Sequence, residues 1–209
     1  MKISVFGGSG RTGIHVIQQA LVSGYEIKAL VRSPEKLKIN DEKLGVLQGD
    51  IFNISDLEPV IKGTEAVVSA LGAPNLGRTH IYSQGMKNII DVMKKYGVKR
   101  LICISAAGVG PGRDPNFPFI FDRILKPLVL GRTFADMYRM EQIIISTDVN
   151  YTIMRPPMLT KRDLTGHYRV EKGKSLPKGK KISRADLAHF MVNCINDEKY
   201  FKCLAAIAY

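Results

Sequence analysis

Three glycines stand three residues apart near the start of the chain, in the stretch GGSGRTG. This stretch follows the apolar run KISVF and precedes the amphipathic run GIHVIQQAL, so we expect a strand, a tight loop and a helix. Glycines at this spacing let the backbone approach a pyrophosphate closely, and N–H groups at a helix start then face the phosphates. The competing interpretation is a purely structural glycine turn. The predicted dinucleotide-binding residues are Gly7, Gly8, Ser9, Gly10, Arg11, Thr12 and Gly13.

The last residue of the second expected strand, YEIKALVR, indicates which dinucleotide fits. A site selective for NAD(H) usually places Asp or Glu there, because a carboxylate accepts hydrogen bonds from the ribose hydroxyls. This chain has Arg32, which cannot accept a hydrogen bond but can pair with a 2′-phosphate. Arg11 and Lys36 add positive charge nearby in the sequence. We therefore predict NADP(H) in preference to NAD(H); the alternative is that Arg32 is a solvated surface arginine.

Two further loops are expected at the same edge of the sheet. GDI ends the third expected strand, where Asp50 can accept a hydrogen bond from the adenine amine and Ile51 can flank the ring. For Asp50, a turn or a helix cap is the competing interpretation. ALGAP, at 70–74, ends the fourth expected strand, and its small residues allow a cofactor ribose to pass close to the backbone.

Strand-like runs alternate with helical patterns along the whole chain. We expect helices at 12–24, 55–63, 79–98, 132–148 and 183–197, and strands at 2–7, 25–32, 45–50, 65–72, 99–108, 150–156 and 202–209. Ser55 and Ser183 are the expected N-caps of two of these helices. The alternation predicts a single α/β domain, residues 1–209, with a Rossmann-like doubly wound, mainly parallel sheet and helices on both faces.

Composition argues against several classes of protein. The net charge of +12 is spread along the chain, and its densest run, 171–181, is expected to be a solvated loop. This distribution favours a positive cleft for small anions over a nucleic-acid surface. No apolar run approaches the roughly 20 residues of a membrane span. The three cysteines are scattered, and no histidine stands at metal-binding spacing, so we predict no disulfide framework and no metal site. We expect a cytoplasmic monomer.

These features together resemble the atypical branch of the short-chain dehydrogenase/reductase superfamily. GGSGRTG is similar to the loop of that branch, and DVNYTIMRPP to its sixth-strand signature. SGYEIKALVR, SQGMKNIIDVMKKYGV and ISRADLAHFMVNCI resemble segments of the small NADPH-dependent flavin reductases, a group that includes biliverdin-IXβ reductase. The resemblance covers nearly the whole chain. It implies that Arg32 holds the 2′-phosphate, that Leu71 and Gly72 line the ribose, that Ser105 is the catalytic serine near the nicotinamide, and that Pro156 borders the nicotinamide.

The chain departs from the superfamily in the residues that usually donate the catalytic proton. Most members use a Tyr-x-x-x-Lys pair, in which the tyrosine donates a proton. Here Tyr138 is followed four residues on by Gln142, and the register set by Glu141 puts the usual positions at Thr133 and Met137. The departure favours a planar conjugated acceptor that takes hydride directly. We expect a flavin (FMN or riboflavin) as substrate, then a linear tetrapyrrole or a quinone. The alternative is a non-catalytic NADP(H)-binding sensor or assembly factor of the NmrA-like type.

Residues around the acceptor are less well defined by the sequence. The segment 106–128 is rich in proline, glycine and aromatic residues and follows the fifth expected strand, so we expect it beside the site. Met158 stands where biliverdin-IXβ reductase has a histidine, which favours flavin over biliverdin. Arg113, Arg132 and Arg155 are candidates to attract an anionic acceptor such as FMN, and surface ion pairing is the alternative for each.

Overall fold

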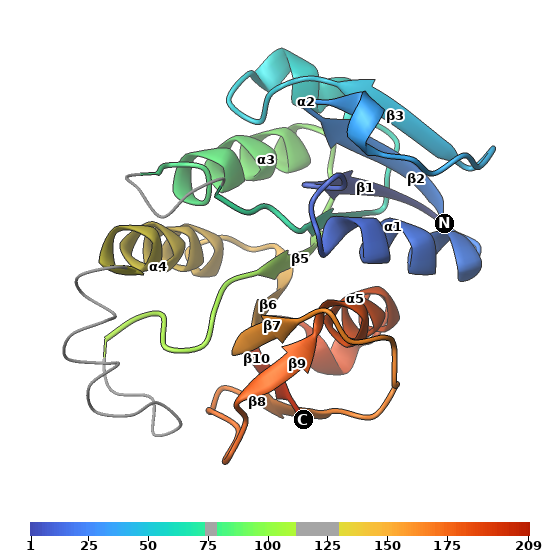
Figure 1. Ribbon diagram of the computed structural model, residues 1–209. Helices are drawn as coiled ribbons and strands as arrows, with labels where there is room; N and C mark the ends of the chain where they lie inside the picture. The colour runs from blue at the N-terminus through green and yellow to red at the C-terminus, as the bar shows by residue number, and fades with distance from the viewer. Residues whose placement is uncertain (74–78, 112–129) are drawn as a thin grey trace.

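The computed structural model describes residues 1–73, 79–111 and 130–209, and these residues build an eight-stranded sheet (Figure 1). The strands are β1 (Lys2–Phe6), β2 (Glu26–Val31), β3 (Leu44–Gln48), β4 (Ala66–Ser69), β5 (Arg100–Ile104), β6 (Asn150–Arg155), β8 (Arg169–Lys172) and β10 (Cys203–Ala208). Their order is β3-β2-β1-β4-β5-β6-β10-β8. Neighbouring strands pair in parallel, except that β8 pairs antiparallel to β10. The first six strands have the order of a dinucleotide-binding fold.

Helices cover both faces of this sheet, as the alternating pattern predicts. On one face lie α1 (Gly13–Val22) and α5 (Arg184–Asn193); on the other lie α2 (Ile54–Ile61), α3 (Ser83–Lys95) and α4 (Gly131–Ile145). Successive side chains of a strand point to opposite faces. In β1, Ile3 and Val5 pack with α1 and α5, whereas Phe6 packs with α2 and α3. The expected doubly wound, mainly parallel α/β fold is confirmed.

Three short strands were not expected from the sequence. A small parallel sheet joins β7 (Met158–Thr160) to β9 (Lys181–Ser183), and β8 lies at the edge of the main sheet. The expected solvated loop at 171–181 therefore overlaps β8 at one end and β9 at the other. Strands of three or four residues are too short for a period of two to be recognised in the sequence. Two 3-10 turns, η1 (Pro34–Lys36) and η3 (Glu198–Tyr200), complete the described elements.

Of the two N-cap residues predicted from the sequence, one is confirmed and the other is wrong. Ser183 caps α5 as expected, because its Oγ accepts a hydrogen bond from the backbone N–H of Asp186 at 2.9 Å. The prediction of Ser55 as the cap of α2 is wrong. Asn53 is the cap, and its side-chain oxygen accepts from both the backbone N–H and the hydroxyl of Ser55. Asn and Ser are both favoured at this position, so composition does not separate them.

The topology brings the loops that follow β1, β2, β3, β4, β5 and β6 to one edge of the sheet. Parallel strands end at the same edge, and ligands of open α/β sheets bind there. Because β9 runs directly into α5, the first residue of α5, Arg184, reaches the same region. Among the helices of the described ranges, none combines the length and apolar character needed to cross a membrane.

Candidate functional site

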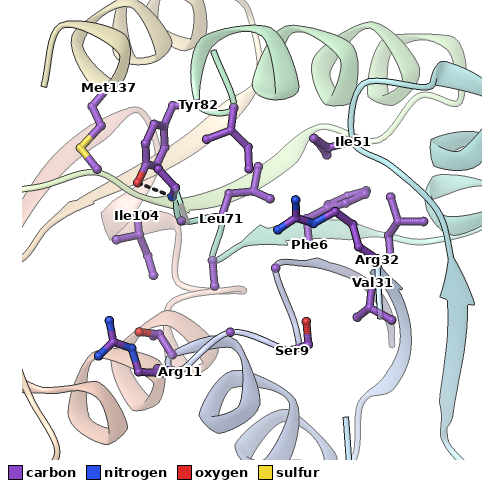
Figure 2. Close-up of a pocket in the computed structure, with 18 of the residues that line it drawn as sticks. Phe6, Ser9, Arg11, Val31, Arg32, Ile51, Leu71, Tyr82, Ile104 and Met137 are labelled. Atoms are coloured by element: carbon purple, nitrogen blue, oxygen red, sulfur yellow. Dashed lines mark hydrogen bonds between the residues drawn. The ribbon is translucent and has the colours of Figure 1, made fainter. Parts of the chain in front are cut away.

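A cavity of about 540 Å³ opens at this edge (Figure 2). Most of the residues predicted to bind a dinucleotide line it. They are Gly7, Ser9, Gly10, Arg11, Thr12, Arg32, Asp50, Ile51, Leu71, Gly72, Ser105 and Pro156. Gly8 and Gly13 do not line the cavity and instead pack the loop against its neighbours. The fold therefore gathers side chains from six loops that are widely separated in the sequence.

The glycine loop is too tightly packed for side chains at two positions. Gly7 has a φ of +74°, and a Cβ there would lie 2.5 Å from the carbonyl oxygen of Ala70. A Cβ on Gly13 would lie 2.1 Å from the carbonyl oxygen of Gly7. Both contacts are with backbone and cannot be relieved by rotating a side chain. Glycine at these positions keeps the loop close to β4 and to the start of α1.

The start of α1 is suited to hold an anion. Its N-cap residue, Thr12, makes no side-chain hydrogen bond to the helix, and the first turn contains no acidic residue. By contrast, Asn53 and Ser183 cap α2 and α5 with their side chains. The first N–H groups of a helix have no partners within the helix. Thr12, directly before α1, lines the cavity together with Ser9 and Gly10, so the residues that lead into the helix lie where the pyrophosphate of a dinucleotide would bind.

The cavity has two chemically different ends. Figure 2 shows Arg32, Val31, Phe6 and Ile51 at one end. Arg32 is exposed, and Lys36 of η1 lies in the same wall, so this end can receive a phosphate. Apolar side chains beside a cationic group suit an adenosine that carries a phosphate. Arg11 points to the opposite end of the cavity, so Lys36 rather than Arg11 accompanies Arg32.

Asp50 takes part in a turn and also lines the cavity. Its Oδ1 accepts a hydrogen bond from the backbone N–H of Phe52 at 3.0 Å, which is the turn interpretation. The backbone N–H of Asp50 in turn donates to Asp56. Asp50 also lines the cavity next to Ile51, so contact of its carboxylate with an adenine amine stays a prediction.

The other end of the cavity carries Ile104, Tyr82 and Met137, which Figure 2 shows together with Arg11. Ser105 lines this region as well, and its backbone N–H donates to the carbonyl of Met154 at 2.7 Å. Its buried Oγ has no hydrogen-bond partner among the residues that the structure describes. A buried hydroxyl without a partner is unusual, and a polar group of a bound ligand would satisfy it. The nicotinamide amide is such a group.

Met137 and Thr133 occupy the positions where the superfamily usually has its lysine and tyrosine. Met137 lines the cavity, whereas Thr133 is buried outside it and its Oγ1 has no partner within the described ranges. Neither side chain can donate a proton to a substrate in this cavity. The usual acid is therefore missing from the structure as well as from the sequence pattern.

Tyr82 is a cavity residue that sequence reasoning missed. Its hydroxyl accepts a hydrogen bond from the backbone N–H of Ala73 at 3.0 Å. Burial raises the pKa of Tyr82, so the phenol stays protonated at neutral pH and can donate its own hydrogen. The sequence pattern placed Tyr82 inside a helix from residue 79, whereas α3 begins at Ser83. The helix begins there because the Asp136 carboxylate accepts the backbone N–H groups of Tyr82 and Ser83.

Of the three arginines proposed from the sequence to attract an acceptor, the two that the structure describes, Arg132 and Arg155, do not line the cavity. Arg155 is paired with the fully buried Glu141, with Nε to Oε1 at 2.9 Å and a second bond from Nη2 to Oε2. Its charge is therefore neutralised within the protein. Arg132 is exposed and does not line the cavity, and Arg113 lies outside the described residues. Arg184, which the sequence did not single out, lines the cavity instead.

The acidic and metal-binding side chains of the described ranges form no cluster of three or more His, Cys, Asp or Glu that could hold a metal ion.

A family model for NAD(P)H-binding proteins matches residues 7–198. The chain belongs to this NAD(P)H-binding family. It is 28% identical to an uncharacterised chloroplastic protein of Arabidopsis thaliana over 99% of its own length and 76% of the relative. With the family established, the resemblance to atypical short-chain dehydrogenases/reductases is confirmed, and the chain is placed among NAD(P)H-dependent oxidoreductases.

Two solved structures share the fold of this NAD(P)H-binding protein. A short-chain dehydrogenase/reductase of Veillonella parvula, in complex with NADP, has a TM-score of 0.84 at 16% identity, covering all of this chain and 94% of its own. ChuY, an anaerobillin reductase from Escherichia coli O157:H7, has a TM-score of 0.83 at 18% identity, covering all of this chain and 97% of its own. At such identities the likeness shows a common fold.

Proposed function

We propose that this protein is a cytoplasmic, monomeric NADPH-dependent reductase of a planar conjugated acceptor. A flavin (FMN or riboflavin) is the first candidate, and a linear tetrapyrrole or a quinone is the second. One observation carries the proposal: the cavity joins a dinucleotide cradle to an end that has lost the usual tyrosine and lysine, at Thr133 and Met137. Reduction of an isolated carbonyl needs an acid to protonate the oxygen. A flavin does not, because its N5 takes the hydride and the single proton that completes the reduction comes from solvent.

The residues of the cavity have separate tasks in this proposal. The loop from Gly7 to Gly13 and the start of α1 bind the pyrophosphate, and Arg32 with Lys36 binds the 2′-phosphate. When bound, NADPH supplies the hydride. Ser105 orients the nicotinamide amide or a nearby water through its unpartnered Oγ. Ile104 and Pro156 form apolar walls that keep two flat rings in contact, and proximity of this kind supplies most of the rate.

The preference for NADP(H) over NAD(H) is part of the same proposal. It is supported by Arg32 at the end of β2, by Lys36 in the same wall and by the NADP held by the Veillonella parvula protein of the same fold. The choice of a planar acceptor is supported by the apolar side chains at the far end of the cavity. A protein of the same fold, ChuY, is an anaerobillin reductase, which supports a linear tetrapyrrole as a further candidate.

A non-catalytic NADP(H)-binding sensor or assembly factor is the second candidate function. The same substitutions at Thr133 and Met137 favour it, because loss of an acid is also expected when catalysis has been lost. The two candidates agree on the cofactor and differ on turnover.

Steady-state oxidation of NADPH separates the two functions. FMN, riboflavin, biliverdin and menadione are offered in turn, and NADPH binding is titrated on the same preparation. The reductase proposal expects saturable NADPH oxidation with at least one flavin. Tight NADPH binding without oxidation by any of the four acceptors would establish the sensor function instead.

A further inference from the structure

Two arginines from different elements meet at the acceptor end of the cavity. Arg11 stands in the glycine loop just before α1, and Arg184 is the first residue of α5. The two helices pack against each other on one face of the sheet, and the side chain of Gln19 donates to the carbonyl of Ala185 at 2.9 Å. Both arginines line the cavity. Figure 2 shows Arg11 at the end with Ile104, Tyr82 and Met137.

Neither arginine has an acidic partner among the residues that the structure describes. Arg184 donates from Nη1 to the carbonyl of Thr160 at 2.9 Å, which fixes its side chain without neutralising it. Burial, and next the charge of Arg11, hold the pKa of Arg184 below its usual range. The guanidinium nevertheless stays charged, because arginine keeps its proton in proteins. Two like charges held this close are stabilised when an anion lies between them.

The nearest acid along α5 does not fill this role. The carboxylate of Asp186 accepts hydrogen bonds from the hydroxyls of Ser183 and Tyr209, at 2.9 and 2.5 Å. It also accepts the backbone N–H groups of Thr165 and Gly166, at 2.9 and 2.8 Å. With these bonds its oxygens are occupied away from the arginines.

The phosphates of the cofactor have their own binding groups. The 2′-phosphate is expected at Arg32, at the opposite end of the cavity, and the pyrophosphate at the backbone N–H groups of the glycine loop. Arg184 instead donates to the carbonyl of Thr160 in β7, and Leu159 of the same strand lines the cavity. An anion there belongs to the molecule that faces the nicotinamide.

We propose that Arg11 and Arg184 form an anion subsite for the acceptor, so that an acceptor bearing a phosphate or carboxylate binds in preference to its neutral counterpart. The inference rests on the proposed reductase function, since it names what the acceptor carries. The side chain of Arg11 thereby serves the acceptor, while the backbone of its loop serves the cofactor.

FMN and riboflavin test the subsite directly, because they share one ring system and differ by a phosphate. The NADP⁺-loaded protein is titrated with each flavin, following flavin fluorescence, and kcat/KM is measured with NADPH. Losing a hydrogen bond to a charged group changes affinity by roughly tenfold or more. We expect FMN to bind about tenfold or more tightly than riboflavin, with a gap that narrows as salt is added. The same comparison can be made for a carboxylate by measuring the binding of biliverdin and of its dimethyl ester, which lacks the two negative charges.

Substitutions of Arg184 and Arg11 test whether these two side chains cause the preference for FMN over riboflavin. Arg184→Gln should remove most of the advantage of FMN and leave riboflavin binding unchanged, whereas Arg184→Lys should restore part of it. Arg11→Gln should also reduce the advantage of FMN. Arg162→Gln removes the same charge from an exposed residue that does not line the cavity, and it should keep the wild-type preference. Thermal unfolding of each variant verifies that it is folded.

The outcomes distinguish the subsite from the proposed function. If FMN binds preferentially through Arg184 but neither flavin is reduced, the reductase function fails and the subsite stands. If the flavins bind equally, or neither binds, the subsite is refuted. A loss of NADPH affinity in Arg184→Gln equal to the loss of FMN affinity would also overturn it, because the arginines would then hold the cofactor pyrophosphate.

Discussion

Arg32 has the clearest single role in the site. It follows β2 directly, is exposed, lines the cavity, and stands where a carboxylate would select NAD(H). Its neighbour in the wall, Lys36, carries the same charge, and the ion pairs of the described residues do not include either side chain. Both charges are therefore available to a ligand phosphate.

Replacement of Arg32 by alanine should weaken NADPH binding and spare NADH. A hydrogen bond to a charged group contributes about 1.5–3 kcal/mol, so the dissociation constant for NADPH should rise roughly 10- to 150-fold. That for NADH should change little, because NADH has no 2′-phosphate. Calorimetric titration of both cofactors measures this. Lys38→Ala, an exposed charge change outside the cavity wall, is the control, and equal losses for both cofactors would refute the 2′-phosphate role.

Ser105 is predicted to orient a group and not to donate the proton. Ser105→Ala should lower kcat by roughly tenfold with NADPH affinity nearly unchanged, well short of the roughly 10²- to 10⁴-fold loss expected for a general acid. Single-turnover reduction of FMN by the NADPH-loaded variant gives the rate, and a binding titration gives the affinity. A fall in kcat of more than about 10²-fold would instead indicate that Ser105 is the general acid, which would contradict the orienting role.

At the residue scale, the sequence identifies the cradle but not the far end. The glycine spacing and Arg32 are local signals, readable from a strand, a loop and a helix that follow one another. Arg184 and Tyr82 reach the cavity through tertiary contacts. Arg184 depends on β9, and Tyr82 depends on Asp136 of α4 holding the start of α3. Neither contact leaves a pattern in a single sequence.

Among the elements, α5 is fixed by a network around Asp186. This fully buried carboxylate binds the cap residue Ser183, the backbone at Thr165 and the hydroxyl of Tyr209 near the end of the chain. Burial raises the pKa of Asp186, but the hydrogen bonds outweigh it, and the net pKa lies below the usual value. The network therefore holds the ionised form and positions Arg184 beside it.

Asp186→Asn should destabilise the protein in a pH-dependent manner. Because the folded pKa is depressed, the stabilisation is fully present above the unfolded pKa of about 3.9 and is lost as pH falls through the folded value. We expect a loss of about 1–3 kcal/mol at neutral pH, shrinking as the pH drops below about 4. Urea unfolding across pH measures it. Asp163→Asn changes the same charge at an exposed position and should behave as wild type at every pH; a constant difference for Asp186→Asn would contradict the charge argument.

At this scale, element type is well predicted and element edges less so. The five helices and seven of the strands follow from period and composition, since their apolar stripes are long. The short strands β7, β8 and β9 were missed, and Asn53 caps α2 in place of Ser55. Short pairings of this kind are decided by neighbours in space.

For the whole molecule, one sheet with helices on both faces directs every loop of the site to one edge. The cavity is lined by residues that follow β1, β2, β3, β4, β5 and β6 and by the start of α5. The net charge of +12 suits a member of an NAD(P)H-binding family, because that cofactor is an anion. The sequence predicts this arrangement, because alternation of strands and helices and right-handed crossovers leave few topologies.

Anaerobic mixing of the NADPH-loaded protein with FMN tests the central claim most directly. Flavin and nicotinamide absorbance are followed together through a single turnover, with NADPH and with NADPH carrying deuterium at the transferred position of C4. Direct transfer predicts that FMN is reduced as NADPH is oxidised, in equal amounts, and that deuterium slows both signals alike. Bound NADPH whose absorbance stays constant while FMN remains oxidised would contradict it.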